Sequence, residues 1–208
     1  MPYLVLIGTA TLVHLLALIS PGPDFIMAVR NSLVYSRKTG LWTAVGFGFG
    51  IAVHILYCLA GLAVVISKSI LIFNTIKFLG AGYLIYIGLK SFYAKSSKLD
   101  VGEYKKKDDI TALSAVKTGF LTNVLNPKAT LFFLSLFTFV ISPNTPMIIM
   151  LIMGSIMIIN TILWFSLVAV LLSQKRIRMI FEKFQNVFNK TFGGLLIVLG
   201  IKIALTEK

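Results

Sequence analysis

The sequence is poor in the residues from which catalytic and metal centres are usually built. Its 208 residues include one cysteine, two histidines and seven acidic residues. The single Cys58 excludes an intramolecular disulfide, a cysteine-based metal cluster and the cysteine pair of a membrane thiol-redox carrier. The sequence contains no Walker A loop and no HExxH motif, so neither ATP hydrolysis nor zinc-protease chemistry is predicted. We therefore predict that the protein is not an enzyme and needs no cofactor.

Charged residues of either sign are also scarce. They make up 13% of the chain, against roughly 25% in a typical soluble domain. Hydrophobic residues make up 57%, and the mean hydropathy is +0.91. A soluble globule of this size could not cover so much apolar surface with so few charges. The composition predicts an all-α, polytopic membrane protein that forms a single transmembrane domain over residues 1–208.

Long apolar segments give the number of predicted membrane spans, because a helix needs roughly 20 apolar residues to cross the hydrocarbon core. Six segments meet this requirement, and solvated loops are expected around 94–112 and 175–190. The predicted spans are residues 3–20, 41–66, 70–89, 113–141, 146–172 and 188–205.

The basic residues are distributed unevenly between the two sides of these spans. The formal net charge is +13, and 15 of the 20 lysines and arginines fall on one side, as Arg30, Arg37, Lys38, the seven lysines from Lys90 to Lys117 and the five basic residues from Lys175 to Lys190. Cytoplasmic loops of membrane proteins carry such an excess. The charge therefore predicts membrane topology, with both termini outside, and no nucleic-acid partner.

The chain resembles itself at two places that are far apart in the sequence. Residues 82–90 and 194–202 share five of nine positions, including two glycines and a lysine. A proline break at Ser20-Pro21 also corresponds to one at Asn126-Pro127, at an offset of 106 residues. Since each half has three spans, the halves are expected to be inverted repeats, over about 3–93 and 113–207. Inverted repeats with broken helices are typical of secondary transporters, whose substrate site lies where the halves meet.

The first break carries Pro21, Gly22, Pro23 and Asp24. Prolines cannot donate backbone hydrogen bonds, and a broken helix inside the bilayer needs protein or water around its freed backbone groups. One interpretation is that Asp24 only complements a helix start just outside the bilayer. The other is that Asp24 binds a substrate ammonium group or a coupling proton, as intramembrane carboxylates commonly do.

The second break carries Asn126, Pro127 and Lys128 within an apolar segment. A lysine there must either extend its amine to the membrane surface or find an anion. If the two breaks meet, Asp24 and Lys128 bring opposite charges to one cavity, which suits a zwitterion. The same placement equally suits a plain ion pair that opens and closes during a transport cycle.

Two further polar residues, His54 and Asn160, lie near the centres of apolar spans. Such residues either connect helices by hydrogen bonds or take part in a site, and His54 is also suited to relay a proton. The glycines at 46, 48 and 50 are expected to serve helix packing.

Several ordered motifs together resemble the LysE/RhtB family of bacterial amino-acid exporters. The motifs are Ser20–Asp24, Arg30-Asn31, Gly46–Gly50 with His54, Gly80–Gly88 and Gly119–Ala129. The resemblance covers most of the chain, from about residue 4 to residue 205. It carries over Pro21, Gly22, Pro23, Asp24, Asn126, Pro127 and Lys128 as the functional core.

The resemblance implies a multi-pass protein of the bacterial cytoplasmic membrane that exports amino acids or their derivatives. It also implies energy from the proton motive force and a homodimer. The resemblance does not decide between a neutral and a basic amino acid as the substrate. A basic amino acid would need acidic neighbours, and Asp24 is the one carboxylate beside an apolar span before Glu207, which favours a neutral zwitterion. The alternatives are a passive amino-acid channel, a non-transporting scaffold and a metal-cation exporter, which the shortage of His, Cys and acidic residues disfavours.

Overall fold

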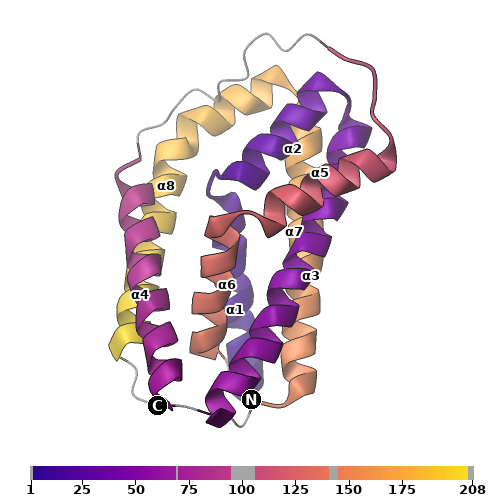
Figure 1. Ribbon diagram of the computed structural model, residues 1–208. Coiled ribbons are helices and arrows are strands. Elements are labelled where there is room, and N and C mark those ends of the chain that lie inside the picture. Colours follow the sequence, from indigo (N-terminus) through magenta and orange to yellow (C-terminus); the bar gives the residue numbers. More distant parts are fainter. Residues whose placement is uncertain (1, 69, 95–105, 141–144, 206–208) are drawn as a thin grey trace.

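A computed structural model of the protein describes residues 2–68, 70–94, 106–140 and 145–205. At residues 2, 62–68, 70–73, 76, 139 and 140 it describes the backbone alone. These residues form eight helices and no strand (Figure 1). In chain order the helices are α1 (Pro2–Ile19), α2 (Pro23–Val34), α3 (Arg37–Lys68), α4 (Ile70–Phe92), α5 (Ala112–Val124), α6 (Pro127–Val140), α7 (Met147–Leu171) and α8 (Lys175–Leu205). The start of α1 and the end of α8 lie at the same end of the molecule (Figure 1).

The all-helical prediction is confirmed, and the count of spans is supported in part. Within the described residues, three helices are long and apolar enough to cross a membrane, at Arg37–Gly61, Met147–Leu171 and Lys175–Leu205. The pair α1–α2 would make a fourth, bent by 55° at its break. The remaining spans of the predicted six would come from α4 and from the broken pair α5–α6, and they stay a prediction. Most of the predicted loop at 94–112 lies outside the described residues.

The predicted loop at 175–190 is wrong, because α8 already begins at Lys175. Its basic residues are interleaved with apolar side chains at helical spacing, so one face of this segment packs while the other carries charge. Ile177 and Phe181 pack against a buried cluster, and the Phe181 ring stacks on Phe25 with centroids 5.0 Å apart. The mean hydropathy of the segment combines its charged and apolar faces, and so it does not predict this helix.

Helices α4 and α8 pack closely through the two sequence segments that resemble each other. A Cβ atom at Gly88 would lie 2.8 Å from the carbonyl oxygen of Gly193, and one at Gly200 would lie 2.8 Å from that of Ala81. Residue numbers rise on one helix as they fall on the other, so α4 and α8 are antiparallel. Small residues at these positions let the two backbones approach each other.

Helices α3 and α7 cross in the same reciprocal way. Gly48 of α3 lies against Ile162 of α7, and Gly154 of α7 lies against Ile55 of α3. The pairs α4–α8 and α3–α7 are therefore both antiparallel.

Buried apolar side chains hold this arrangement together. The larger cluster joins α3, α4, α6 and α7 through, among others, Ile51, Leu84, Phe133, Phe137 and Met157. A smaller cluster joins α2 to α3 and α7, where the rings of Phe47 and Phe165 lie 4.8 Å apart beside Phe25. Aromatic rings at this separation contribute both burial and favourable edge contacts. The smaller cluster fixes α2, and with it the position of Asp24.

The segment before α5 is tied to the turn between α2 and α3. The carboxylate of Asp109 accepts hydrogen bonds from Ser36 Oγ at 2.8 Å and from Thr39 Oγ1 at 3.1 Å. The backbone N–H of Lys107 donates to the carbonyl oxygen of Val34 at 2.8 Å. The chain that enters the second half is thus attached to the first half.

Candidate functional site

The two breaks are built alike at the start of their second helices. Helix α2 begins with Pro23 after Gly22, and α6 begins with Pro127 after Asn126. A proline suits the first position of a helix because its missing N–H has no partner there. Asp24 and Lys128 therefore occupy the same position, the second residue of each helix. This alignment pairs the breaks at an offset of 104 residues instead of the predicted 106.

Asp24 is buried within the protein, with 8% of its surface exposed. Its Oδ2 accepts a hydrogen bond of 2.8 Å from Nδ2 of Asn123 in the last turn of α5. Its Oδ1 has no hydrogen-bond partner among the described residues. A buried carboxylate with a free oxygen can accept a proton or a hydrogen bond from a cation.

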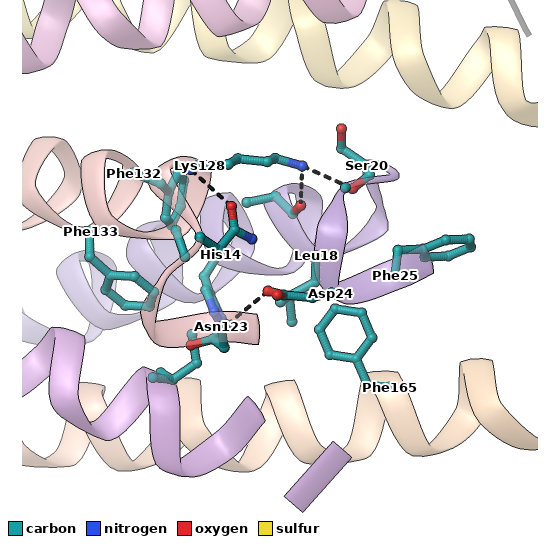
Figure 2. Close-up of a pocket in the computed structure, with 15 residues that line it drawn as sticks. His14, Leu18, Ser20, Asp24, Phe25, Asn123, Lys128, Phe132, Phe133 and Phe165 are labelled. Carbon is teal, nitrogen blue, oxygen red and sulfur yellow. Dashed lines mark hydrogen bonds between the residues drawn. The ribbon is translucent and has the colours of Figure 1, made fainter. Parts of the chain in front are cut away.

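Lys128 binds the end of α1 rather than Asp24. Its Nζ donates to the carbonyl oxygen of Ser20 at 2.9 Å and to that of Ala17 at 3.5 Å (Figure 2). The last carbonyls of a helix lack intrahelical partners and attract cations. Nζ also lies 5.3 Å from the centroid of the Phe192 ring. In this conformation Asp24 is hydrogen-bonded to Asn123 and Lys128 to the end of α1.

Asn126 shapes the second break. Its Oδ1 accepts a hydrogen bond of 3.0 Å from the backbone N–H of Lys128, which caps the N-terminus of α6. The backbone of Lys128 is thereby fixed, while its long side chain lies over Gly22. A Cβ atom at Gly22 would sit 3.4 Å from Cδ of Lys128.

Asp24 and Lys128 line one small inner cavity between the breaks (Figure 2). The other polar side chains lining it are those of His14, Ser20, Asn123 and Asn126, and its aromatic walls are Phe25, Phe132, Phe133 and Phe165. Its volume is about 40 Å³. A water molecule needs roughly 10–15 Å³ on this measure. The inner cavity has room for a few waters but not for an amino acid, so a substrate could enter only after the helices move.

Three buried polar atoms of the side chains around the inner cavity have no hydrogen-bond partner in the described structure. They are His14 Nδ1, Asp24 Oδ1 and Asn123 Oδ1. Buried polar groups are normally paired, and leaving one unpaired costs roughly 1–3 kcal/mol. The Oδ1 of Asn123 faces Gly50 of α3, so the unpaired atoms that favour a polar ligand here are those of His14 and Asp24.

A second, outer cavity of about 490 Å³ adjoins the inner one. Both cavities are lined by Ser20, Gly22, Asn126 and Lys128, which form the wall between them. Pro21, Pro23 and Pro127 face the outer cavity only. All seven residues predicted at the breaks therefore line one or both cavities.

The other two predicted site residues lie outside both cavities. His54 of α3 connects two helices: its Nε2 lies 3.1 Å from the carbonyl oxygen of Asn123, and its Nδ1 lies 2.9 Å from the hydroxyl of Tyr57. His54 thus supports Asn123, which in turn holds Asp24. Asn160 of α7 is half-buried and lines neither cavity.

The inner-cavity residues that were not predicted as site residues include two buried polar ones, His14 and Asn123. His14 lies in the middle of α1 with 1% of its surface exposed, and its ring faces Phe133 at 5.6 Å. A polar residue deep in an apolar span is energetically costly. The location of His14 in such a span was the feature of the sequence that could have identified it as a site residue. Asn123, in the last turn of α5, lines the inner cavity together with Asn126 of the break that follows.

The described residues include no group of three or more His, Cys, Asp or Glu side chains that could hold a metal ion.

Comparisons with known proteins agree with one another over nearly the whole chain. The family model for LysE type translocators matches residues 15–207. An uncharacterized membrane protein of Bacillus subtilis strain 168, YrhP, is 36% identical over 195 residues, which cover 90% of this chain and 93% of the relative. No solved structure matches the chain.

Relatives with a stated activity are more distant but cover more of the chain. The threonine efflux protein of Escherichia coli strain K12 is 28% identical over 206 residues, which are 98% of this chain and all of the relative. The threonine efflux protein of Salmonella typhi is 27% identical over the same length. These similarities indicate a multi-pass membrane transporter rather than an enzyme.

Proposed function

Because this chain belongs to the LysE type translocator family, we propose that it is a secondary transporter that exports an amino acid across the bacterial cytoplasmic membrane by alternating access. The observation that carries the proposal is the pair of breaks, which bring the buried carboxylate of Asp24 and the half-buried side chain of Lys128 to one cavity. Threonine, from the names of the efflux relatives, is the first substrate to test.

The charges of the inner cavity suit the backbone of a free amino acid. The unpaired Oδ1 of Asp24 can accept a hydrogen bond from the α-ammonium group. Lys128 can exchange its bonds with the carbonyls of Ser20 and Ala17 for a stronger bond with the α-carboxylate. One acidic and one basic group favour a neutral zwitterion over a cationic amino acid, which would need a further carboxylate.

The proposal includes the inverted-repeat architecture. The reciprocal contacts of α4 with α8 and of α3 with α7 support a twofold relation between the halves. So does the shared position of Asp24 and Lys128 after the prolines that start α2 and α6. In such transporters the substrate site lies between the repeats and is exposed to each side in turn.

Energy from the proton motive force and assembly as a homodimer are further parts of the proposal that rest on the family resemblance. Cells preloaded with labelled threonine test the energy source. Export through a driven transporter should stop when an uncoupler collapses the proton gradient. Export that continues down the concentration gradient at an unchanged rate would instead identify a passive channel.

Replacing Lys128 with alanine should reduce export from preloaded cells by at least about tenfold, because a charge-assisted hydrogen bond to the substrate carboxylate is lost. The matched control is Lys117→Ala, since Lys117 is exposed and lies outside both cavities. Export and the amount of protein in the membrane are measured together. Normal export by Lys128→Ala at normal protein levels would exclude Lys128 from the site.

The distribution of basic residues predicts the orientation in the membrane. A reporter that is active only outside the cytoplasm, fused after Lys208, should be active, whereas the same reporter placed after Lys107 should be inactive. If the reporter were active after Lys107 and inactive after Lys208, the orientation would be the reverse of the one proposed.

A further inference from the structure

We propose that the outer cavity is a separate binding site for a zwitterionic amino acid, which the substrate occupies from the cytoplasmic side before it passes Lys128. This inference rests on the proposed function and adds a second site to it. The outer site is defined by Gln185, Asn189 and Lys90 together with the shared wall at Lys128.

The outer cavity is the larger of the two spaces that meet at Lys128. Its volume is about 490 Å³, against about 40 Å³ for the inner cavity. Ligand sites for small molecules are commonly of the larger size. In this conformation an amino acid therefore fits outside the wall and is excluded from inside it.

Gln185 of α8 lines the outer cavity, and a turn of its side chain, whose Oε1 is buried in this conformation, would present an acceptor to an ammonium group there. Only 4% of its surface is exposed, yet its Oε1 has no hydrogen-bond partner in the described part of the chain. A buried amide oxygen left unpaired is unfavourable, so a donor from a ligand would stabilise it. An α-ammonium group is such a donor.

Lysines supply the opposite charge. Lys128 stands in the wall, with its Nζ on the carbonyl oxygen of Ser20, and Lys90 lines another part of the cavity near the end of α4. The α-carboxylate of an amino acid whose ammonium group is at Gln185 would be attracted to these amines. Ser91 has a structural role here, because its Oγ donates to the carbonyl oxygen of Asn189 at 3.1 Å and holds α4 to α8.

One face of α8 connects the outer site with the wall. Gln185, Asn189 and Phe192 are buried at positions i, i+4 and i+7, which lie on the same side of a helix. At 1.5 Å per residue, this row is about 10 Å long. It ends at the Phe192 ring, which lies 5.3 Å from the ammonium group of Lys128. A carboxylate that draws Lys128 away from Ser20 would open the wall at the end of this row.

The location of the outer site also agrees with the predicted direction of transport. Lys90 ends α4, and Gln185 lies in the basic first part of α8, so both belong to the side that carries most basic residues. That side is predicted to be cytoplasmic. An exporter collects its substrate there.

Transport into inside-out membrane vesicles tests the outer site, because their cytoplasmic face is on the outside. We expect Gln185→Leu to raise the threonine concentration for half-maximal uptake by about tenfold, with a maximal rate within about twofold of the unchanged protein. The matched control is Gln174→Leu, which makes the same substitution at an exposed residue just before α8 that lines neither cavity. The inference would be overturned if Gln185→Leu reached half-maximal uptake at the same threonine concentration as the unchanged protein.

A cysteine at position 185 gives a second measurement that does not depend on transport. The native Cys58 is fully buried and lines neither cavity, whereas position 185 lines the outer cavity, so a small membrane-impermeant maleimide should label the Gln185→Cys protein with little background. Labelling should occur from the cytoplasmic side, and threonine should slow it. The protection should persist when Asp24→Asn is added, since the outer site lies before the inner cavity. Absence of labelling, or labelling that threonine does not slow, would overturn the outer site.

The two proposals fail in different ways. If the unchanged protein transports none of a panel of amino acids in vesicles, the proposed function fails. If it transports threonine, but the Gln185 variants show neither the raised half-saturation nor the protection, only the outer site fails.

Discussion

Replacing Asp24 with asparagine should reduce export of labelled threonine from preloaded cells to the level of cells without the protein. The substitution keeps the size of the side chain and its ability to bond to Asn123, but removes the negative charge. It removes both the electrostatic attraction for an ammonium group and the capacity to bind a proton. The expected loss is at least about tenfold from the charge-assisted hydrogen bond alone, and complete if Asp24 also couples protons.

The matched control for this prediction is Asp108→Asn, since Asp108 is exposed and lies outside both cavities. Both variants should reach the membrane in amounts equal to the unchanged protein, because the apolar cluster around Phe25 holds α2 without help from the charge. Substantial export by Asp24→Asn, with the control unaffected, would show that Asp24 only stabilises the start of α2.

Replacing Gly46 with valine should have the largest effect on folding. Gly46 of α3 and Gly119 of α5 lie at a reciprocal contact in which the backbones themselves touch. A Cβ atom at Gly46 would overlap the carbonyl oxygen of Val116, and one at Gly119 would overlap that of Thr43. An extra side chain in a packed interior destabilises a protein by roughly 1–3 kcal/mol when neighbouring side chains can shift. The cost is larger at Gly46, because the neighbouring atoms belong to the backbone of α5. We expect α3 and α5 to separate and the amount of folded protein to fall several-fold.

The control is Gly61→Val in the same helix, where a Cβ atom would meet no atom of the described residues within 4 Å apart from the backbone of α3 itself. Size-exclusion chromatography of fluorescently tagged variants after heating in mild detergent measures the folded fraction. A melting temperature of Gly46→Val equal to that of Gly61→Val would show that α3 and α5 do not rely on this contact.

The positions of the breaks were predictable from the sequence because proline and glycine act on their own backbone. Pro23 and Pro127 start helices wherever the rest of the chain lies, so the breaks and the residues after them could be identified. The partners of Lys128 could not. They are backbone carbonyls at the end of α1, and every residue type offers the same carbonyl. The sequence therefore left open whether Lys128 reaches the membrane surface, binds a substrate anion or pairs with Asp24.

The contribution of single polar residues was harder to predict than the breaks. His14, His54 and Asn160 all lie in apolar spans, but the sequence does not show which side of a helix faces the cavity. His14 lines the inner cavity, whereas His54 bonds to the backbone of Asn123. The early start of α8 was not predicted because charged and apolar residues are mixed along this part of the sequence. The apolar residues form a packed face only through their contact with the cluster around Phe25, which the sequence does not show.

The attachment of Asp109 to the turn between α2 and α3 has a consequence for how the helices can move. Helix α5 follows that attachment, and at its other end Asn123 is bonded to Asp24 of α2. Between these ends α5 lies against α3 through Gly46 and Gly119. Helices α2, α3 and α5 are therefore joined to one another at both ends of α5 and along its length, although α5 follows the loop that separates the two halves of the chain. A rearrangement that preserves these contacts moves the three helices together, and with them Asp24 and Asn123.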